Sequence, residues 1–167
     1  MSPSDGGAQQ TVYDPDEFPE SFGTFLRYLT EPGVPQRPAG IRSLGIRPDL
    51  WLKQVSPGKV RYVWPNAGER DISPGRAFGG WVAGFSDHIV SICMFSALAP
   101  GENFTTQDLE VKLFRPVGHG DVTIDAWVVN RSRSTGYVEA EWRNPDGKLA
   151  VKVLAWKAIR PESELPR

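Results

Sequence analysis

The pattern of apolar residues predicts a helix in two stretches of the chain. In residues 18–29, apolar side chains fall on one face of a helix, which predicts a short amphipathic helix. Residues 81–98 are rich in apolar and small residues and contain no proline, and Pro100-Gly101 follows them directly. A helix that is apolar on nearly all sides is buried on nearly all sides, so this stretch predicts one long central helix.

The remaining apolar positions mostly alternate with polar ones, which is typical of half-buried strands. Two such runs are joined by Ser56-Pro57-Gly58 and two others by Asn144-Pro145-Asp146-Gly147, both of which are turn sequences. The predicted strands cover residues 50–55, 59–64, 104–114, 121–129, 137–142 and 148–158.

Strands that follow one another through short turns pair antiparallel, and a twisted antiparallel sheet needs a partner for its apolar face. The long helix supplies that partner. The sequence therefore predicts the α+β class, with one antiparallel sheet wrapped around one helix.

Glycine and proline divide the chain into a main domain and two ends. Residues 1–40 are expected to form an N-terminal helical extension, with a mobile lead-in over 1–17 and a connector over 31–40 that excludes helix. The main domain is expected over 41–160, and residues 161–167 are expected to form a tail.

Composition excludes several classes of function. The chain has 167 residues, of which 40% are hydrophobic, and its 19 basic and 20 acidic residues nearly cancel, which argues against nucleic acid as a partner. One cysteine and two histidines are too few for a disulfide framework or a typical zinc site, so we expect no metal and no cofactor. No run approaches the roughly 20 apolar residues of a membrane span, and the N-terminus lacks a signal-peptide pattern. The sequence predicts a cytoplasmic protein without membrane contact.

Asp87 is the residue that does not fit its helix. A carboxylate in an apolar helix is costly unless it is paired, hydrogen-bonded or open to a cavity. One interpretation is structural, in which Asp87 caps a neighbouring segment or pairs with an arginine. The other is catalytic.

Gly79 and Gly80 come just before the predicted helix and leave the backbone N–H groups at its positive end open to a ligand. Eight residues separate Gly79 from Asp87, a rise of roughly 12 Å along a helix. One small reacting group cannot touch both within one chain. If both act on one carbonyl, a second copy supplies one of them, and we expect a homodimer.

The segment Gly75-Arg76-Ala77-Phe78-Gly79-Gly80, followed by Asp87, resembles the signature of hotdog-fold thioesterases of the phenylacetate-degradation (PaaI) type. The resemblance continues through residues 107–117, which end in Phe114-Arg115-Pro116, and covers about residues 45–160. It implies the hotdog fold, an acyl-CoA or acyl-carrier-protein thioester as substrate, and a homodimer or homotetramer.

The resemblance also implies roles for individual residues. The Gly79 N–H would stabilise the oxyanion, and Asp87 would act as general base or as nucleophile. Thr106 matches a helper hydroxyl on the strand after the helix. Gly80, Ser73 and Trp81 are expected to lie at the substrate.

Phe78 departs from the family, which usually has histidine there, since phenylalanine makes no such hydrogen bond. Phe78 either lines an aromatic or bulky acyl pocket or packs in the core. Arg131 and Arg133 lie where the family meets the coenzyme A phosphates, although turn arginines are often plain solvated charges. His88 does not share the face of Asp87 and is expected to be a core or dimer-contact histidine.

Two functions follow from these residues. The first is hydrolysis of an aromatic or medium-chain acyl-CoA thioester, which the placing of Asp87 favours. The second is a hotdog pocket that binds an acyl or aromatic ligand or performs another reaction, which the loss of the loop histidine favours.

Overall fold

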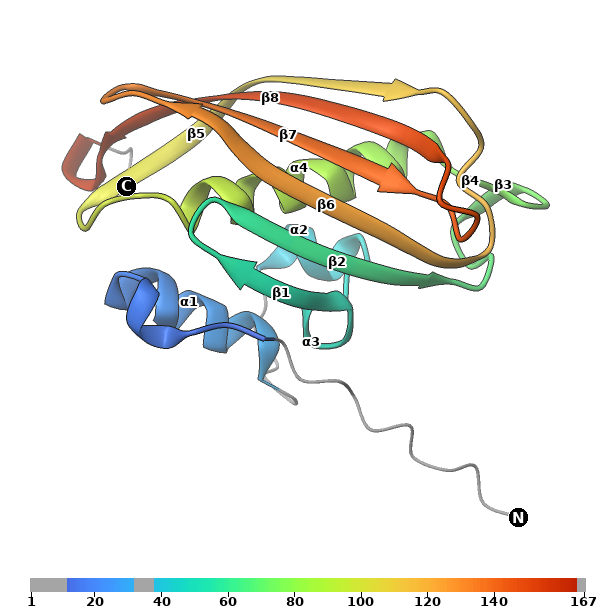
Figure 1. The fold of residues 1–167 in the computed structure, drawn as a ribbon, viewed down its shortest axis with the longest axis horizontal. Coiled ribbons are helices and arrows are strands. Elements are labelled where there is room, and N and C mark those ends of the chain that lie inside the picture. Colours follow the sequence, from blue (N-terminus) through green and yellow to red (C-terminus); the bar gives the residue numbers. More distant parts are fainter. Residues whose placement is uncertain (1–11, 32–37, 165–167) are drawn as a thin grey trace, which may run out of the picture.

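The protein is built on one six-stranded antiparallel sheet (Figure 1). The computed structural model describes residues 12–31 and 38–164. The strand order is β1-β2-β6-β7-β8-β5, so β1 and β5 form the two edges. The strands are β1 (Leu52–Ser56), β2 (Lys59–Asn66), β5 (Glu102–Leu113), β6 (Gly120–Arg131), β7 (Thr135–Arg143) and β8 (Leu149–Pro161).

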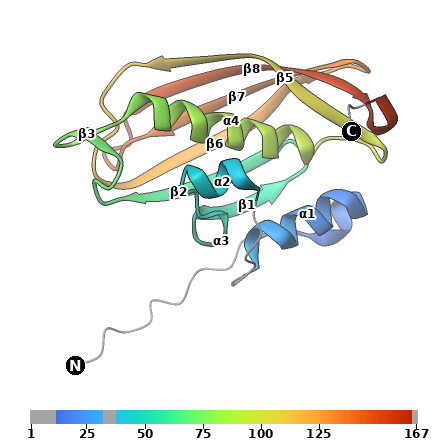
Figure 2. The same cartoon turned by 180° about the vertical axis from the view of Figure 1, so that it is seen from behind.

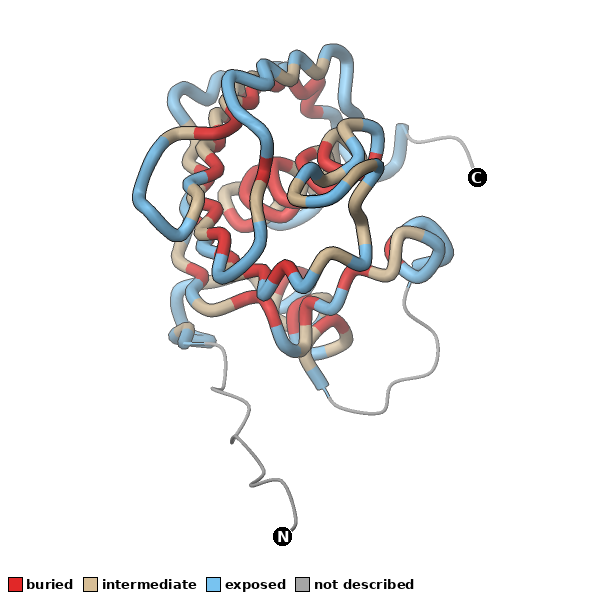
Figure 3. Tube along the Cα trace, turned by 90° about the vertical axis from the view of Figure 1, so that its right-hand side faces the viewer, coloured by how far each residue is buried: buried red, intermediate tan, exposed pale blue. Residues whose placement is uncertain are grey.

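The long helix α4 (Gly79–Phe95) lies along one face of this sheet (Figure 2). Seen end on, the sheet curves around the helix, and buried residues line the space between them (Figure 3). Phe85, Ile89 and Cys93 of α4 are fully buried there. The predicted α+β class is confirmed, and the sheet wraps around the helix as expected.

Several short elements that the sequence pattern does not predict precede α4. The loop before the helix contains a small hairpin, β3 (Asp71–Ser73) and β4 (Arg76–Ala77). Before β1 lie two short helices, α2 (Ala39–Ser43) and α3 (Pro48–Trp51). The expectation that residues 31–40 exclude helix is therefore wrong at its end, because Ala39 and Gly40 begin α2 as soon as Pro38 has been passed. Residues 32–37 lie outside the described part of the chain.

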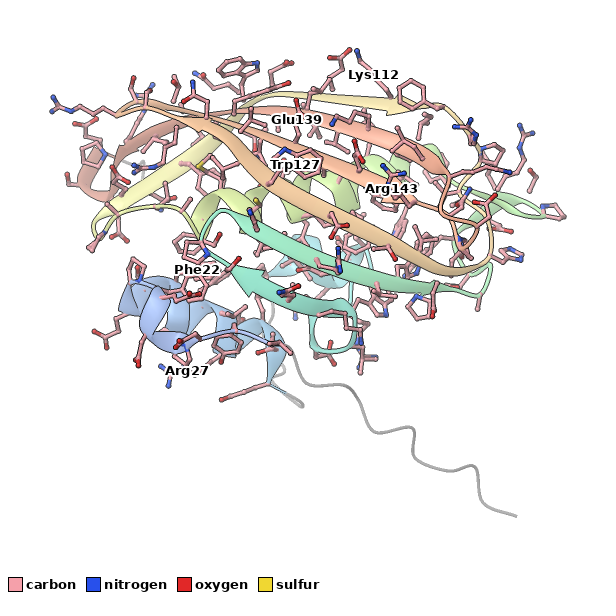
Figure 4. All side chains as sticks on the ribbon, in the orientation of Figure 1. Phe22, Arg27, Lys112, Trp127, Glu139 and Arg143 are labelled. Atoms are coloured by element: carbon pink, nitrogen blue, oxygen red, sulfur yellow. The ribbon has the colours of Figure 1, made fainter. Side chains whose placement is uncertain are left out.

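The predicted N-terminal helix is present as α1 (Glu20–Thr30). Its apolar face packs into the core through Phe22, Leu26 and Leu29. Figure 4 shows Phe22 on the side of α1 toward the sheet and Arg27 on the opposite side. The ring of Phe22 meets Phe95 at the end of α4 edge-on, with centroids 5.2 Å apart. The helix thus covers the C-terminal end of α4.

Both ends of the chain contain short ordered pieces within the described residues. Val12, in the expected lead-in, makes a parallel bridge to Gln54 of β1, and Pro15–Glu17 forms a 3-10 turn. Glu162–Glu164 forms another 3-10 turn after β8. The rest of the expected lead-in and tail lies outside the described residues.

Over residues 12–31 and 38–164, no helix has the length and hydropathy needed to cross a membrane. The same residues contain no group of three or more histidine, cysteine or acidic side chains placed to hold a metal ion.

Candidate active site

The centre of α4 carries Asp87 at a point where three elements meet. Asp87 is the only aspartate, glutamate, lysine or arginine in the helix, and its side chain is 46% exposed. The Thr106 hydroxyl on β5 donates to Asp87 Oδ1 at 3.1 Å. The Lys157 ammonium on β8 lies 3.4 Å from the same oxygen. The expected Asp87 and Thr106 therefore meet, and Asp87 pairs with a lysine rather than an arginine.

Sequence reasoning missed Lys157, although a signal was present. Val151, Val153, Ala155 and Ile159 point inward from β8, and Lys157 continues this period-two series as its only charged member. Its side chain has no exposed surface. Burial lowers the pKa of the Lys157 ammonium, and the nearby Asp87 carboxylate opposes that shift.

A bulge in β5 turns Thr106 toward the helix. Thr106 pairs directly with Lys157 across the β5–β8 ladder, and the register then shifts before Asp108 pairs with Trp156. In an unbroken strand, Thr106 and Asp108 would share a face, because side chains alternate with a period of two. The extra residue, Gln107, leaves Thr106 on the helix side of the sheet with Lys157, where it is still exposed, and places Asp108 on the other side with Trp156.

The N-terminus of α4 is open. Its cap residue Phe78 makes no side-chain capping bond to the first N–H groups, and its own side chain is 51% exposed. A hollow of about 410 Å³ lies beside Gly79. The residues that line it are Ile72, Arg76, Ala77, Gly79, Val82, Leu113, Phe114, Arg115, Pro116 and Val117. Four of the apolar side chains around this helix end, those of Ile72, Phe78, Leu113 and Phe114, are exposed.

Trp81 and Ser73, which were expected at the substrate, do not line the hollow beside Gly79. Trp81 is nearly buried, and its Nε1 donates to the Leu44 carbonyl at 2.7 Å. Its ring packs on Trp64 and borders a second hollow that also contains Phe78. Ser73 lies on β3 and is half-buried. Phe78 is therefore a surface aromatic beside the helix end, and the core-packing alternative does not describe it.

The two candidate arginines have different partners. Arg131 forms an ion pair with Glu102 at the start of β5. Arg133 lines a hollow of about 410 Å³ together with Arg160 and with Gln107 of the bulge. The structure thus brings Arg133 together with a residue that the sequence did not suggest, Arg160, and leaves Arg131 engaged with a carboxylate.

The remaining candidate side chains have structural surroundings. The His88 Nε2 lies 2.8 Å from the Tyr62 hydroxyl, and burial lowers the pKa of His88 to about 4. Burial also raises the pKa of the Cys93 thiol to about 12, which keeps it protonated near neutral pH. His88 is therefore partly buried against the sheet, as expected for a core histidine.

The comparison with protein families matches residues 74–151 to the model of the thioesterase superfamily. This stretch begins just before the open helix end and includes Gly79, Asp87 and Thr106. Residues 74–151 are thus similar in sequence to the thioesterase superfamily. Lys157 lies beyond the matched segment.

Several solved structures with the same fold carry the word thioesterase in their names. A thioesterase from Haemophilus influenzae is 17% identical, with a TM-score of 0.70, and the match covers 96% of this chain and all (100%) of that one. A phenylacetic acid degradation-related protein from Ralstonia eutropha is 22% identical, with a TM-score of 0.64 over 82% of this chain and 98% of that chain. No curated protein matches by sequence.

A third similar structure carries a ligand in its name. It is a hypothetical thioesterase protein with coenzyme A from Streptococcus pneumoniae, 17% identical, with a TM-score of 0.59 over 66% of this chain and 84% of that chain. At these identities the structures show a shared fold, so the predicted hotdog architecture is confirmed. The predicted enzyme class, a thioester hydrolase, agrees with the family match.

Proposed function

We propose that the protein hydrolyses an acyl-CoA thioester, with Asp87 activating the attacking water. The observation that carries the proposal is the position of the Asp87 carboxylate. It is a half-exposed carboxylate held by Thr106 and Lys157, on the same helix whose open N-terminus supplies unpaired N–H donors. A positioned base and an oxyanion site are the two parts that acyl transfer to water requires.

The two parts lie too far apart on one chain to act on one carbonyl. Gly79 and Asp87 are separated by two turns of a continuous helix, or roughly 12 Å. We therefore propose a homodimer in which Gly79 of one copy and Asp87 of the other share a site. The 12-residue edge strand β5 fits this arrangement, because its outer edge is unpaired and it carries both Thr106 and Leu113.

In the proposed reaction, the Gly79 N–H donates a hydrogen bond to the carbonyl oxygen of the thioester, and the helix dipole further stabilises the negative charge that develops on that oxygen. Asp87 takes a proton from water as the water oxygen bonds to the carbonyl carbon. The C–S bond then breaks, and the thiolate leaving group receives the proton.

The exposed apolar residues around the helix end indicate the acyl group. Phe78 and Ile72 border one hollow, and Leu113 and Phe114 border the other. Such surroundings favour an aromatic or medium-chain acyl group over a short polar one. We propose that Arg133 and Arg160, which line a separate hollow together, bind the phosphates of the coenzyme.

The test is release of free thiol from a panel of aliphatic and aromatic acyl-CoA thioesters, measured for the wild type and for Asp87→Asn. We expect turnover to fall by about 100- to 10,000-fold in the variant, with fold and oligomeric state retained. Asp121→Asn, an exposed carboxylate at the start of β6, is the matched control and is expected to keep full activity. An Asp87→Asn variant as active as the wild type would remove Asp87 from the mechanism.

Phe78 favours a second function, binding of an acyl or aromatic ligand without hydrolysis, because it cannot supply the hydrogen bond of the usual loop histidine. A wild-type protein that binds a non-hydrolysable acyl-CoA analogue but releases no thiol from any thioester would establish this alternative.

The shared site has its own test. Asp87→Asn and Gly79→Val are each expected to be inactive as pure dimers. Mixed dimers of the two contain one site with both defects and one site with neither, so co-expression should restore part of the activity. Inactive mixed dimers would show that each chain holds a complete site.

A further inference from the structure

Lys157 is the only charged residue in the buried set of the part of the chain that the structure describes. It projects from β8 toward α4, between inward-facing apolar residues of the same strand. Transfer of an ammonium group out of water is costly, and a buried ion pair is often no more stable than apolar residues of the same size. The stability of the core therefore gives little reason for a lysine at this position.

The Lys157 ammonium has as many hydrogen-bond acceptors as it has N–H donors. Its Nζ lies 2.7 Å from Thr106 Oγ1, 3.0 Å from Ser91 Oγ and 3.4 Å from Asp87 Oδ1. The nitrogen also lies 5.4 Å from the centroid of the Phe104 ring. The ammonium on β8 is thus held by residues of two other elements, α4 and β5.

The direction of these bonds follows from the chemistry of the donors. An ammonium has no lone pair, so the Thr106 hydroxyl accepts from Lys157, and the single hydrogen of that hydroxyl is directed to Asp87. Thr106 and Lys157 both donate to Oδ1 of Asp87. No described residue donates to Oδ2, and the Asp87 side chain is 46% exposed.

We propose that Lys157 is a positioning residue of the active site, which with Thr106 anchors Oδ1 of Asp87 and leaves Oδ2 as the oxygen that meets the substrate. This rests on the proposed thioester hydrolysis. Oδ2 takes the proton from the attacking water as the water oxygen bonds to the carbonyl carbon. In the following step the C–S bond breaks, and Oδ2 returns the proton to the thiolate leaving group. Lys157 acts through Asp87 and does not touch the reacting atoms, since its side chain has no exposed surface.

The kinetic test compares Lys157→Met, which keeps the length of the side chain, with Lys157→Arg, which keeps its charge. We expect Lys157→Met to lower kcat by about 10- to 100-fold with little change in KM, because the carboxylate is then held by one donor instead of two. Lys157→Arg is expected to recover part of this loss. A change in packing alone would not favour the bulkier arginine over methionine.

The matched control is Lys152→Met on the same strand. Lys152 points to the other face of the sheet, where it pairs with Glu139 and Glu141. The control is expected to keep the wild-type kcat. Equal kcat values for Lys157→Met and the wild type would overturn the proposal while leaving the proposed hydrolysis intact.

A second measurement does not depend on activity. The melting temperatures of Asp87→Asn, Lys157→Met and the double variant form a cycle that measures their coupling. We expect Asp87→Asn to lower the melting temperature, because the buried ammonium loses its anion, and the added Lys157→Met to recover much of the loss. If the double variant's change in melting temperature equals the sum of the two single changes, the pairing of Asp87 with Lys157 is contradicted. If the wild type hydrolyses no thioester, the proposed function and the role of Lys157 in it both fall, and the cycle alone decides whether Lys157 holds Asp87.

Discussion

The ring of Phe78 lies over Gly80, and a Cβ atom built on Gly80 would fall 2.7 Å from Cζ of that ring. Phe78 is therefore folded back over the first turn of α4, beside the N–H groups that we assign to the oxyanion. Only a glycine at residue 80 leaves room for the ring in this position, so the two residues together shape the entrance to the helix end.

Gly80→Ala is expected to displace the Phe78 ring rather than unfold the protein, because that ring is half exposed and free to move. The free energy of unfolding should change by less than about 1 kcal/mol, since alanine also favours the helix by a similar amount. The ratio of KM for aromatic and aliphatic thioesters should change. The double variant Phe78→Ala/Gly80→Ala has no ring for the new methyl group to displace, so it separates the effect of moving the ring from the effect of alanine on the helix. An unchanged KM ratio in both variants would place Phe78 outside the acyl site.

Replacing Arg133 and Arg160 by alanine is expected to raise KM for coenzyme A thioesters by about 10-fold or more, because each guanidinium binds phosphate strongly. Thioesters of N-acetylcysteamine, which lack the nucleotide, should show little change. Arg131→Ala is the matched control, since Arg131 is paired with Glu102 instead. Equal effects on both kinds of substrate would contradict a role for these arginines in binding phosphate.

His88 is expected to make stability depend on pH. Its pKa is about 4 in the folded protein against an ordinary value of 6.5, so the unfolded chain binds more protons between these values. The contribution of His88 is therefore complete above about pH 6.5 and is lost as the pH falls toward about 4. In His88→Gln, which does not titrate, the decline of the denaturant midpoint over this window should be smaller. A decline as steep as in the wild type would assign it to other groups.

The packing of α1 predicts that the N-terminal extension stabilises the main domain. Leu26 is fully buried in the same core as α4 and the sheet. Leu26→Ala should lower the free energy of unfolding by about 2–5 kcal/mol, as is usual for a core leucine. Arg27→Ala, on the exposed side of the same helix, is the control and should change it by less than about 0.5 kcal/mol. A small effect of Leu26→Ala, with one cooperative transition, would mean that α1 is only loosely attached.

Much of the fold follows from local patterns. The central helix and all six strands of the large sheet were predicted within a few residues of their bounds, because each is long enough for its period to show. The short helices α2 and α3 and the β3–β4 hairpin contain two to five residues each, which is too few for any period to be seen.

The candidate site divides in the same way. Asp87 was predicted, because it is a charge in an apolar helix. Lys157 was missed, although it gives the same kind of signal, a charge in an inward-facing series. Thr106 is different, because alternation alone places it on the outer face with Asp108. Only the bulge at Gln107 turns it inward, and a bulge depends on the pairing of β5 with β8 rather than on the sequence of β5. The meeting of Arg133 with Arg160 also depends on tertiary structure, since they lie on separate segments.

The bridge that Val12 makes to β1 means that the two edge strands of the sheet, β1 and β5, are not equally open to pairing. The Val12 N–H donates to the Lys53 carbonyl and the Val12 carbonyl accepts from the Val55 N–H, so part of the β1 margin is already occupied. Joining β1 of one molecule to β5 of the next would be a head-to-tail contact, which can repeat without limit and build a fibre. Joining β5 to β5 uses the same surface twice and ends after two molecules. The few residues around Val12 thus work against open-ended pairing through β1.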